Sequence, residues 1–258
     1  MIPPIPMIAT VQIGQQLYQT ALTGGIDLSL PLIAGPDSVN CFYAPMVEYE
    51  PVRMGSFVGS VQEGGVVNFF NVRLNPHGNG THTECVGHIA AERFVIRECL
   101  EDVHFRAKLV SIYPQRMEDG DRVVTADQIR EIIAPGEVEA LLIRTLPNVP
   151  EKKQQQYSGT NPPYLAPEAL EWMVHCGIRH LLVDLPSVDR EEDEGKLAAH
   201  KAFWQYPGSE IRRDCTITEL FYAPNEVKDG YYLLTIQIAA FDLDASPSRP
   251  ILFPLERA

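Results

Sequence analysis

The sequence predicts a single large α/β domain built on a mixed β-sheet. Its 258 residues, 45% apolar and 21% charged, are enough for a sizeable core without disulfide or metal staples. Apolar segments with strand character recur along the chain between segments with helical periodicity. The two kinds do not alternate strictly as strand, helix, strand, so a sheet of mixed direction is expected, with no internal repeat and no linker.

The first part of the chain carries the least regular patterns. Residues 11–22 have an apolar stripe at helical spacing that a Gly-Gly pair ends, which predicts a helical N-terminal arm over residues 1–25. Residues 26–30 alternate like a strand. Residues 33–45 are expected to form a loop, in which Phe42 is either buried or lines a pocket.

The middle and last parts give clearer elements. Residues 47–52 are expected to be a strand, and residues 57–61 and 66–74 a hairpin that leads the chain into His77. A capping box at Thr125 and a proline at residue 167 predict helix starts. Further strands are expected at 107–113, 140–145, 178–184, 231–241 and 251–255, with helices at 125–133, 167–176 and 196–204.

Charge and cysteine usage exclude several classes of protein. A net charge of −13 and the lack of a basic stripe argue against a nucleic-acid partner. No apolar run approaches membrane-spanning length. Five scattered cysteines without a CxxC pair indicate free thiols, and residues 1–7, apolar but rich in proline, make a poor signal peptide. A cytoplasmic protein is therefore expected.

Residues 75–88 hold the densest group of chemistry-bearing side chains: His77, His82, Glu84 and His88. The two glycines between the first two histidines remove bulk and permit positive φ, so the backbone can turn sharply. If residues 81–84 are extended, His82 and Glu84 share one face. Imidazole and carboxylate form the ligand set of a zinc or manganese hydrolytic site. The alternative is a glycine-rich turn with surface histidines. That alternative would be favoured for a single histidine, but three histidines beside an acid favour a metal site.

Two later residues, His200 and Glu219, are the other ligand candidates. A carboxylate between two cations can bridge them, and two metals can stabilise an attacking hydroxide and a developing oxyanion. One histidine of the cluster is expected to act as a general acid/base. For His200, packing on Trp204 at i,i+4 is the competing interpretation.

Cys85 has two functional interpretations and one structural one. It could be a thiolate ligand or a nucleophile. The favoured interpretation is a small residue that points away from the site, because neighbours on a strand face opposite sides. The remaining histidines are expected to be structural or solvated: His104, His175 and His180.

The stretch from His77 to His88 resembles the HxGTHxDxPxH signature of the cyclase-like metal-dependent hydrolases, the family of bacterial kynurenine formamidase and isatin hydrolase. Other segments are similar to the family pattern and follow in its order, so that the likeness spans about residues 26 to 255. They are residues 27–29, 177–189, 199–200, 218–219 and 244–249.

The resemblance implies a swivelling β/β/α-type fold for residues 26–258, a homodimer or homotetramer, and two divalent ions, with zinc favoured over manganese. It assigns His77, His82 and Glu84 to the first metal, with Glu84 bridging, and His200 and Glu219 to the second. It makes His88 the general acid/base. A metal-bound hydroxide would attack the carbonyl of a small-molecule formamide, amide or lactam, as in an arylformamidase. A lactam hydrolase or cyclase, or a catalytically silent binding protein, remain the alternatives.

The sequence departs from the family pattern at the site itself. Five steps separate His77 from His82 where the family has four, and the added residue is expected to bulge out among the glycines. Glu84 replaces an aspartate and Val86 a proline. Phe42 is the candidate for the aromatic residue that covers the substrate.

Overall fold

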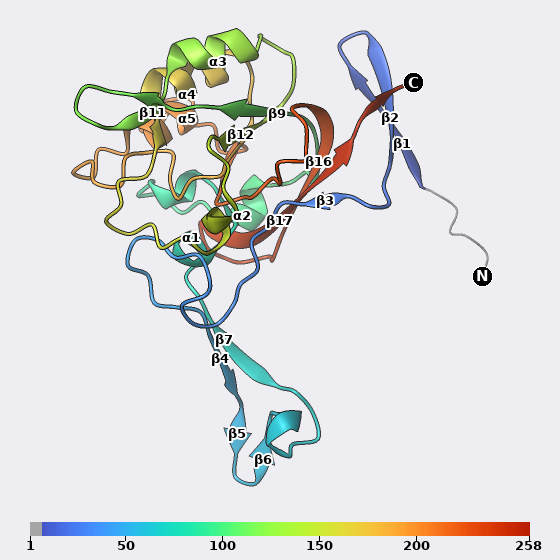
Figure 1. Ribbon diagram of the computed structural model, residues 1–258, viewed down its shortest axis with the longest axis vertical. Helices are drawn as coiled ribbons and strands as arrows, with labels where there is room; N and C mark the ends of the chain where they lie inside the picture. The colour runs from blue at the N-terminus through green and yellow to red at the C-terminus, as the bar shows by residue number, and fades with distance from the viewer. Residues whose placement is uncertain (1–6) are drawn as a thin grey trace.

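A computed structural model describes residues 7–258 of the chain (Figure 1). Its centre is a sheet that closes on itself: strands follow the order β16, β9, β12, β14, β15, β8, β17, and β17 pairs back to β16. The short β3 adds to the outer edge of β17. The strands are β3 (Ile26–Asp27), β8 (His82–Glu84), β9 (His104–Ile112), β12 (Ala140–Thr145), β14 (His180–Val183), β15 (Thr216–Glu219), β16 (Gly230–Ile238) and β17 (Ala245–Pro254).

The sheet is mixed, as predicted. β9, β12, β14 and β15 run parallel, and β8, β16 and β17 join them through antiparallel pairings. The central strands β12 and β14 are buried along their whole length, as expected for parallel strands covered on both faces. The predicted α/β fold of the swivelling β/β/α type is confirmed.

Alternation along β12 divides the core into two layers. Leu141 and Ile143 face the helices, and Ala140 and Leu142 face the inside of the closed sheet. The helical layer consists of α3 (Ala126–Ile132), α4 (Pro167–His175) and α5 (Ala198–Trp204), which pack on one side of the sheet (Figure 1). Among the described residues, the remaining α-helices are the single turns α1 (Pro76–Asn79) and α2 (Ile96–Cys99).

Both predicted helix starts are confirmed. The Thr125 hydroxyl accepts from the Gln128 backbone N–H, and the Gln128 side chain accepts from the Thr125 N–H, so the capping box is complete. Pro167 opens α4, and Gly177, at φ +82°, lies just beyond its end. Small strands frame this side of the molecule: β10 (Gln115–Arg116), β11 (Arg122–Val124) and β13 (Tyr164–Leu165).

The helix predicted for residues 11–22 is wrong. β1 (Ile8–Ile13) and β2 (Gln16–Ala21) form a hairpin that turns at Gly14, and β18 (Glu256–Arg257) adds to β2. β-Branched and aromatic residues alternate here, and Tyr18 packs on Tyr231 with ring centroids 6.2 Å apart. Residues 1–6 of the predicted N-terminal arm, and with them most of the supposed signal segment, lie outside the described residues.

A long ribbon, residues 48–73, projects from the closed sheet (Figure 1). β4 (Glu48–Pro51) pairs with β7 (Phe70–Arg73), and β5 (Arg53–Met54) pairs with β6 (Phe57–Val58) near the tip. The predicted strand at 47–52 is confirmed, but the predicted pairing of 57–61 with 66–74 is wrong. A 3-10 turn (Val61–Glu63) sits where that hairpin was expected.

One further difference from the prediction concerns the last strand. β17 begins at Ala245, so most of residues 244–249 is strand where a turn was expected, because Ala245 to Pro247 pair with β8. In the described part of the chain, no helix has the length and apolar character needed to span a bilayer.

Candidate metal centre

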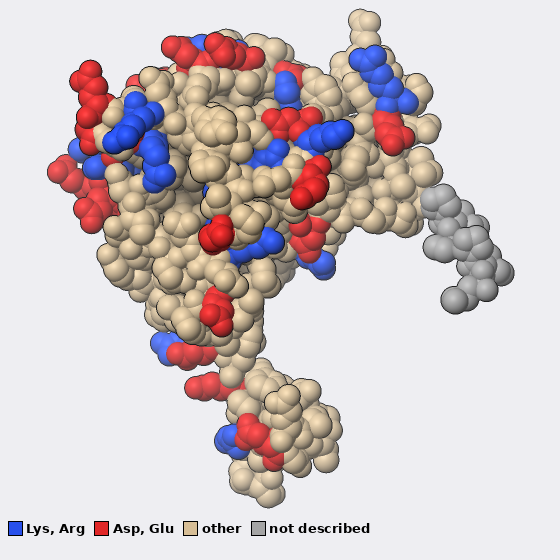
Figure 2. Space-filling model, viewed as in Figure 1, with Lys and Arg blue, Asp and Glu red and all other residues tan. Residues whose placement is uncertain are grey.

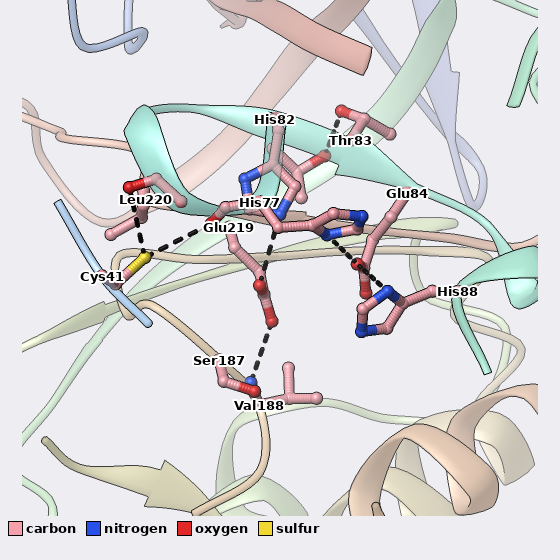
Figure 3. Close-up of polar contacts among 12 residues, drawn as sticks. Cys41, His77, His82, Thr83, Glu84, His88, Ser187, Val188, Glu219 and Leu220 are labelled. Carbon is pink, nitrogen blue, oxygen red and sulfur yellow. Dashed lines mark hydrogen bonds and ion pairs between the residues drawn. The ribbon is translucent and has the colours of Figure 1, made fainter. Parts of the chain in front are cut away.

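Strand pairing brings the first ligand candidates together. β8 lies between β15 and β17, and its His82 stands directly opposite Glu219 of β15. His82 and Glu84 are both fully buried, and His82 Nε2 lies 3.4 Å from Glu219 Oε2 (Figure 3). The predicted extended conformation of His82 to Glu84 is confirmed, and His82 and Glu219, which are 137 positions apart along the chain, are paired in the sheet.

His77 reaches the same place from α1. The Asn75 side chain caps this helical turn by accepting from the Gly78 N–H. His77 Nδ1 lies 3.0 Å from Glu84 Oε2, and the His77 and His82 rings are 5.1 Å apart. Where the sequence predicts a bulge, Gly78 and Asn79 belong to the helical turn α1, and Gly80 follows it.

The two glycines of this loop serve close packing. A Cβ on Gly78 would lie 2.3 Å from the Ala44 Cβ, and one on Gly80 would lie 2.9 Å from a Leu32 methyl group. Neither glycine occupies the left-handed region of φ, so the loop does not use the positive φ that glycine permits. Their lack of a side chain lets the loop lie against residues 32 and 44.

α5 supplies His200. Its Nε2 lies 3.1 Å from Glu84 Oε1 and 3.9 Å from Glu219 Oε1. Its ring also packs on Trp204, with centroids 5.4 Å apart. The packing and ligand interpretations of His200 are therefore compatible, because the ring lies against the tryptophan while Nε2 faces the acids.

His88 lies at the end of a 3-10 turn (Val86–His88) that follows β8. Its Nδ1 is 3.7 Å from Glu84 Oε2 and 3.5 Å from Asp244 Oδ2. The His88 ring is 4.4 Å from the His77 ring. With 31% of its side chain exposed, His88 is more accessible than the fully buried His82.

The chemistry of this group of residues fits a divalent cation, and two of its buried polar atoms support this. His82 Nε2 and Glu84 Oε2 are inaccessible to solvent and make no well-formed hydrogen bond among the described residues, although Glu219 Oε2 and His77 Nδ1 lie 3.4 Å and 3.0 Å from them, respectively. The separations of 3.0 Å between His77 Nδ1 and Glu84 Oε2, and of 3.1 Å between His200 Nε2 and Glu84 Oε1, are close to the ~3.3 Å expected between two ligands of a tetrahedral cation with bonds of about 2.0–2.1 Å. The donor set of imidazoles and carboxylates is one that zinc accepts.

The second ring nitrogen of each candidate histidine ligand meets an acceptor. Such partners fix the tautomer and orient the ring of metal-binding histidines. The pairs are His77 Nε2 with Asp244 Oδ2 at 2.8 Å, His200 Nδ1 with Asp189 Oδ2 at 2.5 Å, and His82 Nδ1 with the Gly80 carbonyl at 3.0 Å.

The sequence interpretation missed the roles of Asp189 and Asp244. Both lie in segments that resemble the family, residues 177–189 and 244–249, but nothing in their spacing pairs them with a histidine. Asp189 also accepts from the backbone N–H groups of Ala199 and His200, and so caps α5 from a separate loop.

Electrostatics couple the histidines to the acids. Burial opposes protonation of His77 and His200, but the adjacent carboxylates outweigh it and raise the pKa of each histidine to about 10. Burial would raise the pKa of Glu84, yet His88, His200 and His77 lower it well below its usual range. Without a cation, the histidine protons compensate the buried acids, so binding of a divalent ion would release protons.

Cys85 lies on the opposite side of β8 from the cluster. It is fully buried, and hydrogen bonding with Cys99 together with burial raises the pKa of its thiol. His180, with Nδ1 2.9 Å from the Thr216 hydroxyl, and His175, stacked on Trp172, lie away from the cluster. Cys85 is placed where the structural interpretation expects it.

A cavity of about 250 Å³ opens over the cluster. Phe42, 42% exposed, lies on its wall, with a backbone φ of +56° that non-glycine residues adopt rarely. The cavity is lined by Phe42, His77, His88, Ser187, Asp189, Arg190, Glu191, Asp193, Leu197, His200 and Glu219. Five candidate residues, from four separate parts of the chain, thus line one small cavity.

Comparison with known proteins places this geometry in a family. A family model described as a putative cyclase matches residues 26–190. The kynurenine formamidases of Bacillus cytotoxicus and Bacillus thuringiensis are each 28% identical, over 197 and 199 residues, which cover 75% and 76% of this chain and 84% and 85% of theirs.

Solved structures share the fold. One, titled a potential metal-dependent hydrolase with cyclase activity, superposes with a TM-score of 0.64 at 17% identity, over 89% of this chain and 96% of its own. Isatin hydrolase A from Labrenzia aggregata, bound to benzyl benzoate, gives 0.63 at 14% identity, over 90% and 94%. Because the family model covers more than half of the sequence, the chain belongs to the putative cyclase family.

Proposed function

We propose that this protein is a divalent-metal-dependent hydrolase that cleaves a carbon–nitrogen bond in a small formamide, amide or lactam, with arylformamidase-like chemistry. The observation that carries the proposal is the convergence of His77, His82, Glu84, His200 and Glu219, in which two buried ligand atoms make no well-formed hydrogen bond among the described residues. The likeness to kynurenine formamidases supports an aryl formamide as the substrate class.

The ligand residues divide naturally between two ions. Glu84 Oε2 faces His77, while Oε1 faces His200, which supports the proposal that this carboxylate would be shared by both ions. His77, His82 and Glu84 would hold the first ion, and His200 and Glu219 the second. Zinc suits the nitrogen and oxygen donors best, and manganese is the alternative. Bound ions would polarise the substrate carbonyl and lower the pKa of water.

His88 is assigned the proton transfers. Its Nδ1 is the ring atom nearest the two carboxylates, so Nε2 is the nitrogen available to a substrate in the cavity. A general acid/base must lie within hydrogen-bond reach of the reacting group and remain accessible to it. His88 would accept the proton of the attacking water and return it to the leaving nitrogen.

Phe42 would hold the substrate. Its half-exposed ring lines a cavity small enough to favour a compact, aromatic-sized ligand. The next residue, Tyr43, also has positive φ, and its N–H donates to the Ser158 hydroxyl at 2.8 Å. This contact with a distant loop keeps the strained Phe42 segment in place.

Two alternatives use the same site. A lactam hydrolase or cyclase needs the same metals, and only the substrate separates it from a formamidase. A catalytically silent binding protein would have no need for six aligned groups with oriented ring nitrogens. We further propose a cytoplasmic homo-oligomer, a dimer or tetramer, without nucleic-acid or membrane partners. The five buried free thiols support a reducing compartment.

The test is hydrolysis of N-formylkynurenine and a panel of small amides and lactams, after chelation and then with added Zn²⁺ or Mn²⁺. His88→Ala is expected to abolish turnover and keep the metal. Loss of metal from this variant would make His88 a ligand instead. His175→Ala is the matched control, because His175 stacks on Trp172 outside the cavity. The silent-protein alternative would be established if the wild type bound no metal and stayed inactive with both ions.

A further inference from the structure

We propose that Asn79 is a positioning residue that connects the metal-binding turn α1 to the turn that presents Phe42, and so sets how tightly the substrate is held. The inference rests on the proposed function, because it concerns the substrate-binding side of the same site. Asn79 lies in the lengthened spacing between His77 and His82, where the sequence departs from the family pattern.

Phe42 and Tyr43 occupy the two central positions of a tight turn, residues 41–44, in a backbone conformation that disfavours them. Their φ values are +56° and +52°, and the Ala44 N–H closes the turn by donating to the Cys41 carbonyl at 3.1 Å. Two consecutive positive φ angles are characteristic of a type I′ turn, which favours glycine, asparagine and aspartate. Bulky residues keep this conformation only when surrounding contacts enforce it. The contacts of the Phe42 turn therefore determine where the ring lies over the cavity.

Three hydrogen bonds join the Phe42 turn to α1. The Asn79 side chain donates from Nδ2 to the Pro45 carbonyl at 3.0 Å. The Cys41 N–H donates to the Gly78 carbonyl at 3.0 Å, and the Cys41 thiol donates to the His77 carbonyl at 3.3 Å (Figure 3). The helical turn that carries a candidate metal ligand thus holds the Phe42 turn at both of its ends.

Asn79 is the side chain that braces both turns at once. It is 1% exposed, and its Oδ1 accepts from the Asn75 N–H at 2.7 Å while its Nδ2 donates to Pro45. Asn75 is the residue that caps α1. Among side chains of this size, an amide is the group that supplies both an acceptor oxygen and N–H donors. The same side chain therefore fixes the start of α1 and the end of the Phe42 turn.

The connection is made by uncharged groups. Asp37 is the only charged residue between positions 28 and 47 of the sequence, and Figure 2 shows a mostly uncharged surface just above the ribbon, where these residues lie. Salt screens interactions between charges and has little effect on hydrogen bonds between neutral groups. The contribution of Asn79 to substrate binding should therefore be the same at low and at high ionic strength.

The test is steady-state kinetics of N-formylkynurenine hydrolysis at saturating Zn²⁺, with metal content verified by mass spectrometry. Asn79→Ala should raise KM about five- to tenfold and change kcat less than about twofold, because the misplaced Phe42 ring no longer holds the substrate. In a Phe42→Ala background, Asn79→Ala should raise KM less than about twofold, because the ring it positions is absent.

Asn148→Ala is the matched control. Asn148 is also buried, donates to a backbone carbonyl, that of Ala223, at 2.9 Å, and lies outside the cavity. Its loss should lower stability as the loss of Asn79 does, and should leave KM unchanged. The comparison separates positioning of the substrate from a general effect on the fold.

Amide hydrogen exchange of a peptide that covers residues 38–47 gives a second readout, which does not depend on activity. Asn79→Ala should exchange faster there than the wild type, and Asn148→Ala should exchange as the wild type does. If the wild type does not hydrolyse N-formylkynurenine, the proposed function fails for that substrate, and the exchange rates alone decide whether Asn79 holds the Phe42 turn.

Four results would overturn the proposal: an unchanged KM in Asn79→Ala, an equal rise in KM with and without Phe42, unchanged exchange of residues 38–47, or loss of metal at saturating Zn²⁺. The last result would mean that Asn79 acts through His77 instead. If Asn79→Ala does not fold, Cys41→Ala should raise KM and Cys41→Ser, which keeps a donor, should restore it. Equal KM values in the two Cys41 variants and the wild type would then refute the connection.

Discussion

Asp189 offers a sharp test of the site because it acts on His200 from two directions. Oδ2 meets His200 Nδ1 at 2.5 Å and so orients Nε2 toward Glu84. Oδ1 accepts from the Ala199 N–H at 2.7 Å, and Oδ2 from the His200 N–H at 3.2 Å. Burial would raise the pKa of Asp189, but His200 and these N–H groups lower it, so the group is charged at neutral pH.

Asp189→Asn keeps the shape but removes the charge and one acceptor. Loss of such an outer partner weakens metal binding about 10- to 100-fold, or about 1.4–2.7 kcal/mol. Weaker capping of α5 removes about 1 kcal/mol from the free energy of unfolding. Competition with a chromophoric chelator measures zinc affinity, and urea denaturation of the metal-free protein measures stability. Exposed Asp127→Asn is the control, and unchanged zinc affinity in Asp189→Asn would refute the role given to Asp189.

Four other predictions concern separate parts of the molecule. Burial lowers the pKa of His180 to about 3, below its value in the unfolded chain. As the pH falls from 7.5 to 5, this histidine gains a proton only in the unfolded chain, so the free energy of unfolding of the wild type should fall by about 2 kcal/mol. In urea denaturation, the His180→Gln variant should not show this fall in stability. Lys152→Met should lower the free energy of unfolding by about 3–5 kcal/mol, because buried Asp184 loses the cation that it pairs with. In a double-mutant cycle, adding Asp184→Asn should restore part of that free energy. Cys85→Ala should keep full activity and metal content, at a cost in stability on the order of 1 kcal/mol; lost activity would contradict its position behind the strand. Phe42→Ala should raise KM about tenfold while changing kcat less, and the reverse split in steady-state kinetics would place Phe42 in the chemical step.

Local rules predicted much of the fold and part of the site. Strand alternation correctly placed His82 and Glu84 on one face, and Cys85 behind them. Capping chemistry located the starts of α3 and α4. These features depend on residues within a few positions of one another, which the sequence displays directly.

What failed depends on contacts between distant residues. Residues 70–73 pair with residues 48–51, and this register depends on contacts between distant parts of the chain. The prediction instead paired residues 66–74 with the segment nearer in sequence, residues 57–61. Residues 8–21 carry apolar spacings compatible with either period, and packing of Tyr18 on Tyr231 decides for strands. Asp189 and Asp244 became visible only when folding brought them to His200 and His77.

The closure of the sheet explains why the site is assembled from distant segments. β8 is a strand of three residues, yet it lies between β15 and β17 and so receives Glu219 from one side and the segment of Asp244 from the other. Such nonlocal pairings cannot be read from the spacing of residues. Candidate ligands were identifiable by type, whereas their mutual orientation required the fold.

The central claim is that metal held by this cluster is required for hydrolysis of a carbon–nitrogen bond. The most direct measurement combines metal content by mass spectrometry with N-formylkynurenine hydrolysis, on chelator-treated protein before and after titration with Zn²⁺ or Mn²⁺. We predict that the metal-free protein has no activity and that activity recovers until two ions are bound per chain. We also predict that Glu84→Ala loses both metal and activity. Full activity in metal-free protein, or metal binding unaffected by Glu84→Ala, would contradict the claim.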